Sequence, residues 1–439
     1  MTLRAILLVL ALALQSGEAA ASPPPQDAEV LYRVRAGDNL YSLAERHLLR
    51  TSDFAIVQRL NRIVDPYHLP VRRTLRIPRK LLRYDRLRAK VTAFRGTVRI
   101  VQRDGSALAA RLGQEIAEGA EITTGANSFI TIQLPDRSVV TMPSQSRIAV
   151  SRLRRYGLTG GIERLFSIVT GRARAIVRPM RGDEDNFRFS TPVAVSAVRG
   201  TEFRMSYRPK DEVATTEVLE GTVAVGAETK PEATIVRAGF GTASNTDKAL
   251  PLPAAPALLR PGAIQDEERL RFNLQPMPGT VGYRVQIAQD AGFLDVVSEA
   301  GAPSPLVELD SLPDGTWFVR ASAIDRNGLE GLADTYSFQR RLNTLTTALE
   351  QRRTGRFREY LFRWEPEGEG THQFRFQLKK AAGDGPALVD EPGLTARRLI
   401  LTNVPPGDYV WRVHTLQFID HTAYGKWSAT ERLTIPRDQ

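Results

Sequence analysis

The first ordered pattern of apolar positions predicts a small β-α-α-β unit over residues 31–79. Tyr32 and Val34 alternate with polar residues as in a strand, and Gly37 then lets the backbone turn sharply. Apolar residues recur at helical spacing in two short stretches that follow, and either Asp38 or Asn39 is placed to cap the first helix. Residues 74–77 are expected to return as a strand.

From residue 84 to residue 245 the pattern changes to that of short β-strands. Ile130, Ile132 and Leu134 place every second side chain on one face, and Asp104-Gly105 marks a tight turn between strands. Helical periodicity is nearly absent here. We therefore expect one β-rich domain over residues 84–245, followed by a Pro/Ala-rich linker over residues 246–262.

Two C-terminal segments, residues 263–341 and 350–437, repeat the same strand pattern. The matching stretches are Tyr283 to Ile287 with Phe374 to Leu378, offset by 91 residues, and Leu312 to Arg320 with Val404 to Arg412, offset by 92. A repeat of this length made of strands is the size of a β-sandwich. The predicted fold class is thus mostly β and multidomain, with a small βααβ module, a β-rich domain and two β-sandwich modules.

Residues 1–21 have the features of a signal peptide. Arg4 precedes an apolar run that is too short to span a bilayer, and Ala19-Ala20-Ala21 offers a cleavage site of small residues. No later segment is apolar enough for a membrane anchor, and the chain has no cysteine to carry a lipid. We expect an exported protein with no integral membrane segment after cleavage, in the periplasm of a Gram-negative bacterium or at the cell surface.

The net charge of +11 is concentrated near the N-terminus, where residues 22–90 hold fifteen basic and seven acidic residues. A second basic stretch, residues 147–181, holds nine Arg against the single Glu163. Such a basic chain often binds nucleic acid, but export argues against that partner. An anionic envelope polymer or acidic lipid headgroups are the expected targets of this charge, although the second stretch could equally be Arg that solvates strand faces.

Residues 31–79 resemble the LysM family. The match is carried by Tyr32-Arg33-Val34-Arg35-Ala36-Gly37-Asp38-Asn39-Leu40-Tyr41-Ser42-Leu43-Ala44, by Asn61 and by Leu75-Arg76-Ile77-Pro78. Asn39 stands where the family usually has Thr, and Arg72 stands where Pro-Gly makes the last turn. The resemblance implies binding of N-acetylglucosamine polymers, in bacteria usually peptidoglycan, through two loops. Carried over by position, the glycan-binding residues are Gly37, Asp38, Asn39, Leu40, Asn61, Arg62 and Ile63.

The region 84–245 resembles the FecR family. The motifs are Phe94-Arg95-Gly96-Thr97-Val98, Gly119 to Gly125, Asp136-Arg137-Ser138, Phe189-Ser190-Thr191-Pro192, Val198 to Phe203 and Val218 to Val225. Arg137 replaces the Gly that is common in the family's Asp-Gly-Ser turn. Family members that regulate iron uptake are membrane-spanning transducers with a cytoplasmic segment. We find neither feature, so the resemblance implies a β-rich extracytoplasmic domain without supporting a role in transcription.

The two C-terminal repeats resemble fibronectin type III domains, in which a Leu-x-Pro stretch and an aromatic residue lead into a long strand. Trp317 and Tyr409 hold the aromatic place, and we expect both to be core or corner residues. Modules of this kind usually act as spacers or as protein-binding surfaces.

Motifs of hydrolytic enzymes are missing from the sequence. It has no cysteine nucleophile, its five histidines show no zinc-binding spacing, and it has neither a Ser-x-x-Lys nor a Gly-x-Ser-x-Gly motif. Asp183-Glu184-Asp185 is an acidic cluster, which we interpret as a solvated loop, although any two carboxylates could meet in the fold. We predict no catalytic residue, no metal site and no cofactor.

The predicted function is that of an exported, non-catalytic envelope protein. It would bind peptidoglycan through the LysM-like module and present its β-domains to an envelope protein. The alternative is an extracytoplasmic sensor that works with a separate membrane partner.

Overall fold

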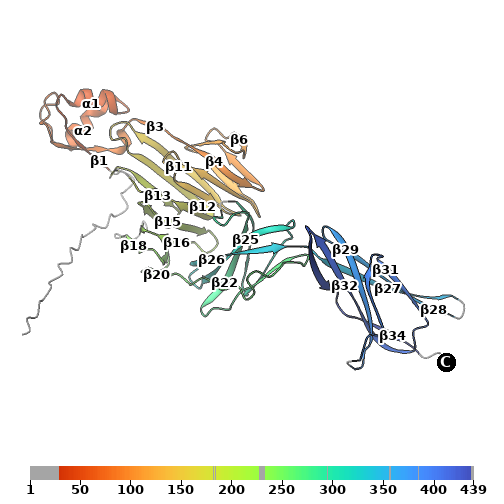
Figure 1. Cartoon of the computed structure of the whole chain (residues 1–439). Helices are drawn as coiled ribbons and strands as arrows, with labels where there is room; N and C mark the ends of the chain where they lie inside the picture. The colour runs from red at the N-terminus through yellow and green to blue at the C-terminus, as the bar shows by residue number, and fades with distance from the viewer. Residues whose placement is uncertain are drawn as a thin grey trace, which may run out of the picture. The chain divides into compact units, whose positions relative to one another are not determined.

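The computed structural model describes residues 29–180, 182, 184–226, 233–293, 295–354, 357–383 and 385–436. The predicted signal peptide lies outside the described residues. Strands dominate, so the predicted mostly β, multidomain fold class is confirmed (Figure 1). No helix among the described residues is long and apolar enough to cross a membrane. By their contacts the residues form two compact units, one that ends at Leu252 and one that begins at Pro253, apart from two short segments.

The N-terminal module, residues 29–78, pairs a two-stranded sheet with two short helices. Its elements are β1 (Glu29–Arg33), α1 (Leu40–His47), the 3₁₀ turn η1 (Thr51–Asp53), α2 (Phe54–Leu60) and β2 (Thr74–Pro78). Strands β1 and β2 are antiparallel, with Leu31 opposite Arg76. Asn39, and not Asp38, caps α1: its side-chain oxygen accepts from the N–H of Ser42 at 2.8 Å, and the Asn39 N–H donates to the Ser42 hydroxyl.

The central domain, residues 84–251, has two β-sheets that share the long strand β12 (Ile162–Ile176). The first sheet runs in the order β6 (Ala107–Ala109), β5 (Val98–Val101), β8 (Glu121–Thr124), β11 (Arg147–Tyr156), β12, β13 (Asn186–Ser190), β14 (Val195–Val198), β17 (Thr222–Gly226) and β18 (Thr234–Arg237), with β3 (Tyr84–Arg86) also on β11. The second runs β7 (Glu115–Ala117), β4 (Arg88–Arg95), β9 (Phe129–Gln133), β10 (Val139–Met142), β12, β15 (Glu202–Arg208), β16 (Val213–Glu220), β19 (Phe240–Ala243) and β20 (Leu250–Pro251).

A cluster of aromatic side chains fills the space between these two sheets. Phe166 and Phe189 of the first sheet stack with ring centroids 5.3 Å apart, and Phe189 meets Phe203 of the second sheet edge-on at 5.6 Å. Strand β12 passes from one sheet to the other near Gly171, whose φ of +85° and close approach to Ser146 leave no room for a side chain. The core thus depends on a continuous β12.

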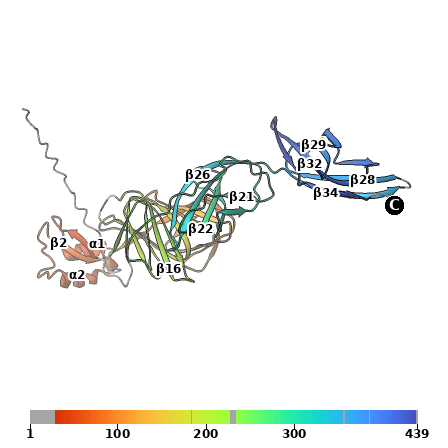
Figure 2. The same ribbon diagram turned by 90° about the horizontal axis from the view of Figure 1, so that it is seen from below.

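Each C-terminal repeat is a β-sandwich of two sheets, and each sheet of the second repeat has one strand more than its counterpart in the first (Figure 2). The first pairs β21 (Leu270–Asn273) with β24 (Leu306–Leu309), opposite the sheet β23 (Val296–Ala302), β22 (Thr280–Ala288), β25 (Gly315–Asp325) and β26 (Glu330–Arg340). The second sets β27 (Thr344–Thr354), β28 (Phe357–Glu367) and β31 (Arg398–Thr402) opposite β30 (Val389–Leu394), β29 (Thr371–Lys380), β32 (Gly407–Ile419), β33 (Thr422–Trp427) and β34 (Glu431–Ile435).

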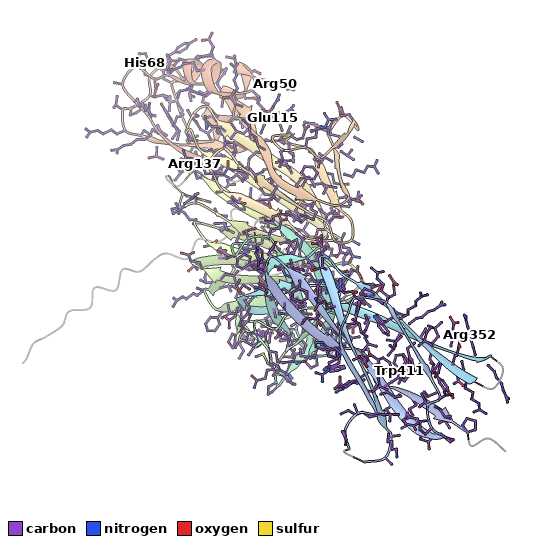
Figure 3. The ribbon with its side chains drawn as sticks, turned by 45° about the vertical axis from the view of Figure 1, so that its right-hand side comes forward. Arg50, His68, Glu115, Arg137, Arg352 and Trp411 are labelled. Atoms are coloured by element: carbon purple, nitrogen blue, oxygen red, sulfur yellow. The ribbon has the colours of Figure 1, made fainter. Side chains whose placement is uncertain are left out.

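Equivalent aromatic residues hold the same corner of both sandwiches. Trp317 donates its indole N–H to the carbonyl of Pro313 at 3.1 Å, and Tyr409 donates its hydroxyl hydrogen to the carbonyl of Pro405 at 2.9 Å. Each bond reaches back four residues, so Trp317 replaces the tyrosine of a tyrosine corner. Trp411 lies inside the second sandwich (Figure 3).

The N-terminal module and the central domain share one hydrophobic core. Tyr156, at the end of β11, and Leu158, in the turn before β12, pack in the same cluster as Leu43, Leu75 and Ile77 of the module. The acidic cluster is also involved: Glu184 pairs with Arg79 at 3.2 Å, and the Asp185 carboxylate accepts from the N–H of Ile162 at 2.8 Å. These two carboxylates are structural, which corrects the interpretation of a solvated loop; Asp183 lies outside the described residues.

Candidate functional site

The two loops that the LysM resemblance implicates lie side by side. The N–H of Leu40, at the start of α1, donates to the carbonyl of Pro66 in the loop after α2 at 2.8 Å. Gly37 makes the turn out of β1 with φ +87°, a backbone conformation that side chains disfavour. The structure therefore brings the start of α1 next to Pro66, which lies in the loop that follows the predicted residues Asn61, Arg62 and Ile63.

The Asp38 carboxylate stabilises the first loop through hydrogen bonds and an ion pair within the module. It accepts hydrogen bonds from the Tyr32 hydroxyl at 2.7 Å and the Arg35 N–H at 2.8 Å, and Arg46 lies 3.2 Å away. Burial acts to raise the pKa of Asp38, but the bonds from Tyr32 and Arg35 outweigh it and hold the pKa below its ordinary value. With its side chain only 8% exposed, Asp38 shapes the loop more directly than it could contact a ligand.

The Asn61 side chain makes hydrogen bonds to the main chain of β2 like those that a neighbouring strand would make. Its amide nitrogen donates to the carbonyl of Arg76 at 2.7 Å, and its oxygen accepts from the Arg76 N–H at 2.7 Å. The same nitrogen also reaches the carbonyl of Val57 at 2.8 Å, which ties the end of α2 to the sheet. Asn61 thus anchors the second loop, and its main-chain carbonyl accepts a hydrogen bond from the Arg73 side chain at 2.6 Å.

The other predicted residues differ in what they can offer a ligand. Leu40 and Ile63 are only 2% and 6% exposed and belong to the module's core, so they shape the loops and offer a glycan almost no surface of their own. The side chain of Asn39 serves as the helix cap. Arg62 is exposed, with φ +50°. The predicted site itself stays a prediction.

An aromatic surface next to these loops was missed by the sequence reasoning. The rings of Tyr41 on α1 and Tyr67 in the loop after α2 stack with centroids 4.7 Å apart, and Tyr41 also meets Phe54 of α2 at 4.3 Å. Tyr67 is 61% exposed. A flat, exposed ring of this kind can stack on the apolar face of a sugar, as amphipathic aromatic residues do at wet interfaces.

Asp65 holds Tyr67 in place by closing a tight turn. Its carboxylate accepts from the Tyr67 N–H at 2.8 Å and contacts the His68 ring nitrogen Nδ1 at 2.7 Å. The hydrogen bonds with His68 and with the Tyr67 N–H lower the pKa of Asp65. The sequence signal for this arrangement is the run Asp65-Pro66-Tyr67, a typical turn former whose aromatic residue is left at the surface.

The described residues provide no set of three or more His, Cys, Asp or Glu side chains arranged to hold a metal ion. His68, in the second loop, contacts one carboxylate, that of Asp65, among the residues that the structure describes.

Family models match two parts of the chain. Residues 32–78 match the LysM domain model, and residues 120–224 match the FecR protein model. The chain therefore carries a LysM domain and a FecR region, as its motifs indicated. Both families are non-catalytic and typical of extracytoplasmic proteins, and the LysM family binds glycans.

Comparison with whole proteins adds little to these matches. No curated protein matches the chain. A crystal structure described as a candidate anti-sigma factor from Parabacteroides distasonis is 21% identical with a TM-score of 0.24, and the match covers 30% of this chain and 57% of that one. The chain thus spans little more than half of that structure.

Two structures of fibronectin type III modules are similar to the chain at the same level. They are a two-domain segment of chicken tenascin (15% identity, TM-score 0.23, 42% of this chain and 99% of that one) and the fibronectin(III)-like modules of Clostridium thermocellum CbhA (12%, 0.19, 41% and 94%). At these TM-scores the likenesses carry no conclusion about this chain.

Proposed function

We propose that this chain is a non-catalytic, exported envelope protein that binds peptidoglycan, or another N-acetylglucosamine glycan, through its LysM domain. The observation that carries the proposal is the contact between the two loops at Leu40 and Pro66, beside the stacked rings of Tyr41 and Tyr67. This arrangement offers main-chain groups for hydrogen bonds and an aromatic face for stacking. The periplasm of a Gram-negative bacterium is the proposed location, with the cell surface as the other one.

In this proposal the central domain and the two sandwiches present surfaces to an envelope protein. Their folds supply rigid sheets, and the FecR match favours a protein partner. The same match supports a second candidate function, in which the chain is an extracytoplasmic sensor that relays to a separate membrane protein. Crosslinking in the native cell separates the two: a membrane signalling protein among the products favours the sensor, and retention by bare sacculi alone favours the scaffold.

Binding is tested by titrating the mature chain with a neutral chitin tetrasaccharide. Tyr67→Ala should weaken binding at least several-fold because it removes the exposed ring, whereas Tyr67→Phe should keep most of the affinity. Leu49→Ala is the matched control, since Leu49 is 52% exposed at the other end of α1. Unchanged binding by Tyr67→Ala would refute the aromatic surface, and no binding by the parent chain would refute glycan recognition altogether.

The non-catalytic character is tested with intact sacculi. The purified mature chain should sediment with them and release no soluble fragments of the wall. Release of muropeptides in proportion to the amount of protein would overturn the proposal and direct attention to the acidic residues.

A further inference from the structure

Three exposed arginines lie in the two loops of the LysM domain: Arg35 in the loop after β1, and Arg62 and Arg72 in the loop after α2. The N–H of Arg72 donates to the carbonyl of Val34 at 2.9 Å, which places Arg72 beside the turn that Arg35 begins. The Arg73 side chain donates to the carbonyl of Asn61 at 2.6 Å, so the residue after Arg72 contacts the residue before Arg62. Arg35, Arg62 and Arg72 are all exposed.

No ion pair within the described part of the chain neutralises these three side chains, although other arginines of the module are paired. Three carboxylates of the module have other partners. Asp38 is enclosed by Tyr32, Arg35 N–H and Arg46, Asp65 is bound to His68, and Glu29 pairs with Arg76. The rim of the glycan loops therefore carries positive charge without an internal counter-charge.

Two of the three arginines occupy backbone positions that suit glycine. Arg62 has φ +50° and Arg72 has φ +70°, in the left-handed region that side chains disfavour. Arg72 stands where the family has the Pro-Gly of its last turn. The chain therefore keeps a charged side chain at a position where a smaller residue would relieve backbone strain, and strain retained at a binding loop suggests a role for the side chain.

We propose that Arg35, Arg62 and Arg72 form a cationic rim that makes this LysM domain select glycan chains bearing carboxylates over neutral chitin. The inference rests on the proposed function and names its substrate class. Peptidoglycan has two sources of such carboxylates, the lactyl groups of the bare glycan and the stem peptides. A planar guanidinium donates two parallel N–H bonds to a carboxylate, which is the geometry that arginine supplies best.

The test is a calorimetric titration of the mature chain with three tetrasaccharides at low and high salt. They are neutral chitin, bare peptidoglycan glycan with free lactyl carboxylates, and the same glycan with stem peptides. The variant Arg35→Gln/Arg62→Gln/Arg72→Gln should bind chitin like the parent and lose roughly tenfold affinity for a carboxylate-bearing glycan at low salt, and the loss should shrink towards 1 M salt. The glycan that shows the larger loss identifies the carboxylate source.

The matched control is Arg50→Gln/Arg86→Gln/Lys90→Gln, which removes the same charge at exposed positions outside the two loops. Arg50 follows α1, and Figure 3 shows it well away from His68 of the second loop. The control should bind all three glycans like the parent. An equal loss in the control, equal affinity of the parent for chitin and for both anionic glycans, or displacement of the glycan by anionic lipid vesicles would each overturn the inference.

A second variant separates charge from loop shape. Arg62→Gly/Arg72→Gly relieves the left-handed strain, so its thermal midpoint should equal or exceed that of the parent while its affinity for the anionic glycan falls. If this variant bound the anionic glycan as tightly as the parent does, the proposed role of the cationic rim would be overturned. If the parent chain bound none of the glycans, the proposed function would fail; chitin binding without preference would sink this inference alone.

Discussion

Arg79, the first residue after the LysM domain, and Glu184 of the FecR region face each other, with the guanidinium nitrogen Nη2 3.2 Å from the carboxylate oxygen Oε2. The same guanidinium lies 5.3 Å from the ring of Tyr156, within the range of a cation–π contact. Behind this pair, Tyr156 and Leu158 complete the hydrophobic core of the LysM domain. The LysM domain therefore packs directly against the FecR region.

Truncation of Leu158 should therefore destabilise the LysM domain, although Leu158 lies about eighty residues beyond it in the chain. We expect Leu158→Ala to cost about 2–5 kcal/mol, the usual range for a buried leucine. Hydrogen exchange of peptides from residues 29–79 would measure this loss of stability. Tryptophan fluorescence would not, because all four Trp lie in the sandwiches and report on other modules. Leu112→Ala, at a 69% exposed leucine, is the control. Unaltered protection of the LysM peptides in Leu158→Ala would disprove the shared core.

We expect Asn61 to contribute to the stability of the LysM domain more than to direct contact with a ligand. Its carboxamide makes three hydrogen bonds to main-chain groups of Val57 and Arg76, and each net bond of this kind contributes about 1 kcal/mol. Asn61→Ala should then cost about 2–3 kcal/mol of the domain's stability, measured by hydrogen exchange, whereas Arg62→Ala next to it should cost little. A variant of Asn61 that is as stable as the parent would contradict this anchoring role.

Arg137 offers a test of backbone strain away from any ligand. It has φ +68° in the turn where Ser138 N–H donates to the Asp136 carboxylate at 3.1 Å. Glycine adopts this conformation freely, so Arg137→Gly should stabilise the chain by up to about 1 kcal/mol in urea unfolding. Arg137→Ala, which removes the same side chain and keeps the strain, is the control. Destabilisation by Arg137→Gly would show that the Arg137 side chain makes a contact worth more than the strain.

The sequence was informative wherever function follows from local pattern. The Gly37 turn, the strand periodicity and the corner positions of Trp317 and Tyr409 all depend on residues close in the chain. Asn61 shows the limit: its position was noticed, but a sequence does not say whether an amide faces a ligand or its own backbone. Tyr41 and Tyr67 were missed because their stacking arises only after the loops meet at Leu40 and Pro66. Leu158 was missed because its contribution to a distant core leaves no periodic signal.

The Asp38 carboxylate predicts how glycan binding depends on pH. Its folded-state pKa lies below the ordinary value of 3.8, so the ionised form stabilises the first loop, and this stabilisation is complete above the unfolded pKa. It is lost as the pH falls through the folded pKa, when protonation weakens the bonds from Tyr32 and Arg35. Binding of the neutral chitin tetrasaccharide should therefore be flat from about pH 8 to pH 5 and should decline below about pH 4.

The variant Asp38→Asn isolates this effect, because it removes the titrating group and keeps the shape of the side chain. It should bind chitin more weakly than the parent at pH 7, and the difference between the two should narrow as the pH falls below 4. Asp65→Asn serves as the comparison, since the pKa of Asp65 is also lowered but its carboxylate holds the second loop. A parent chain whose chitin affinity stays constant down to pH 3, with the fold intact by circular dichroism, would show that the charge of Asp38 is not what keeps the first loop in its binding shape.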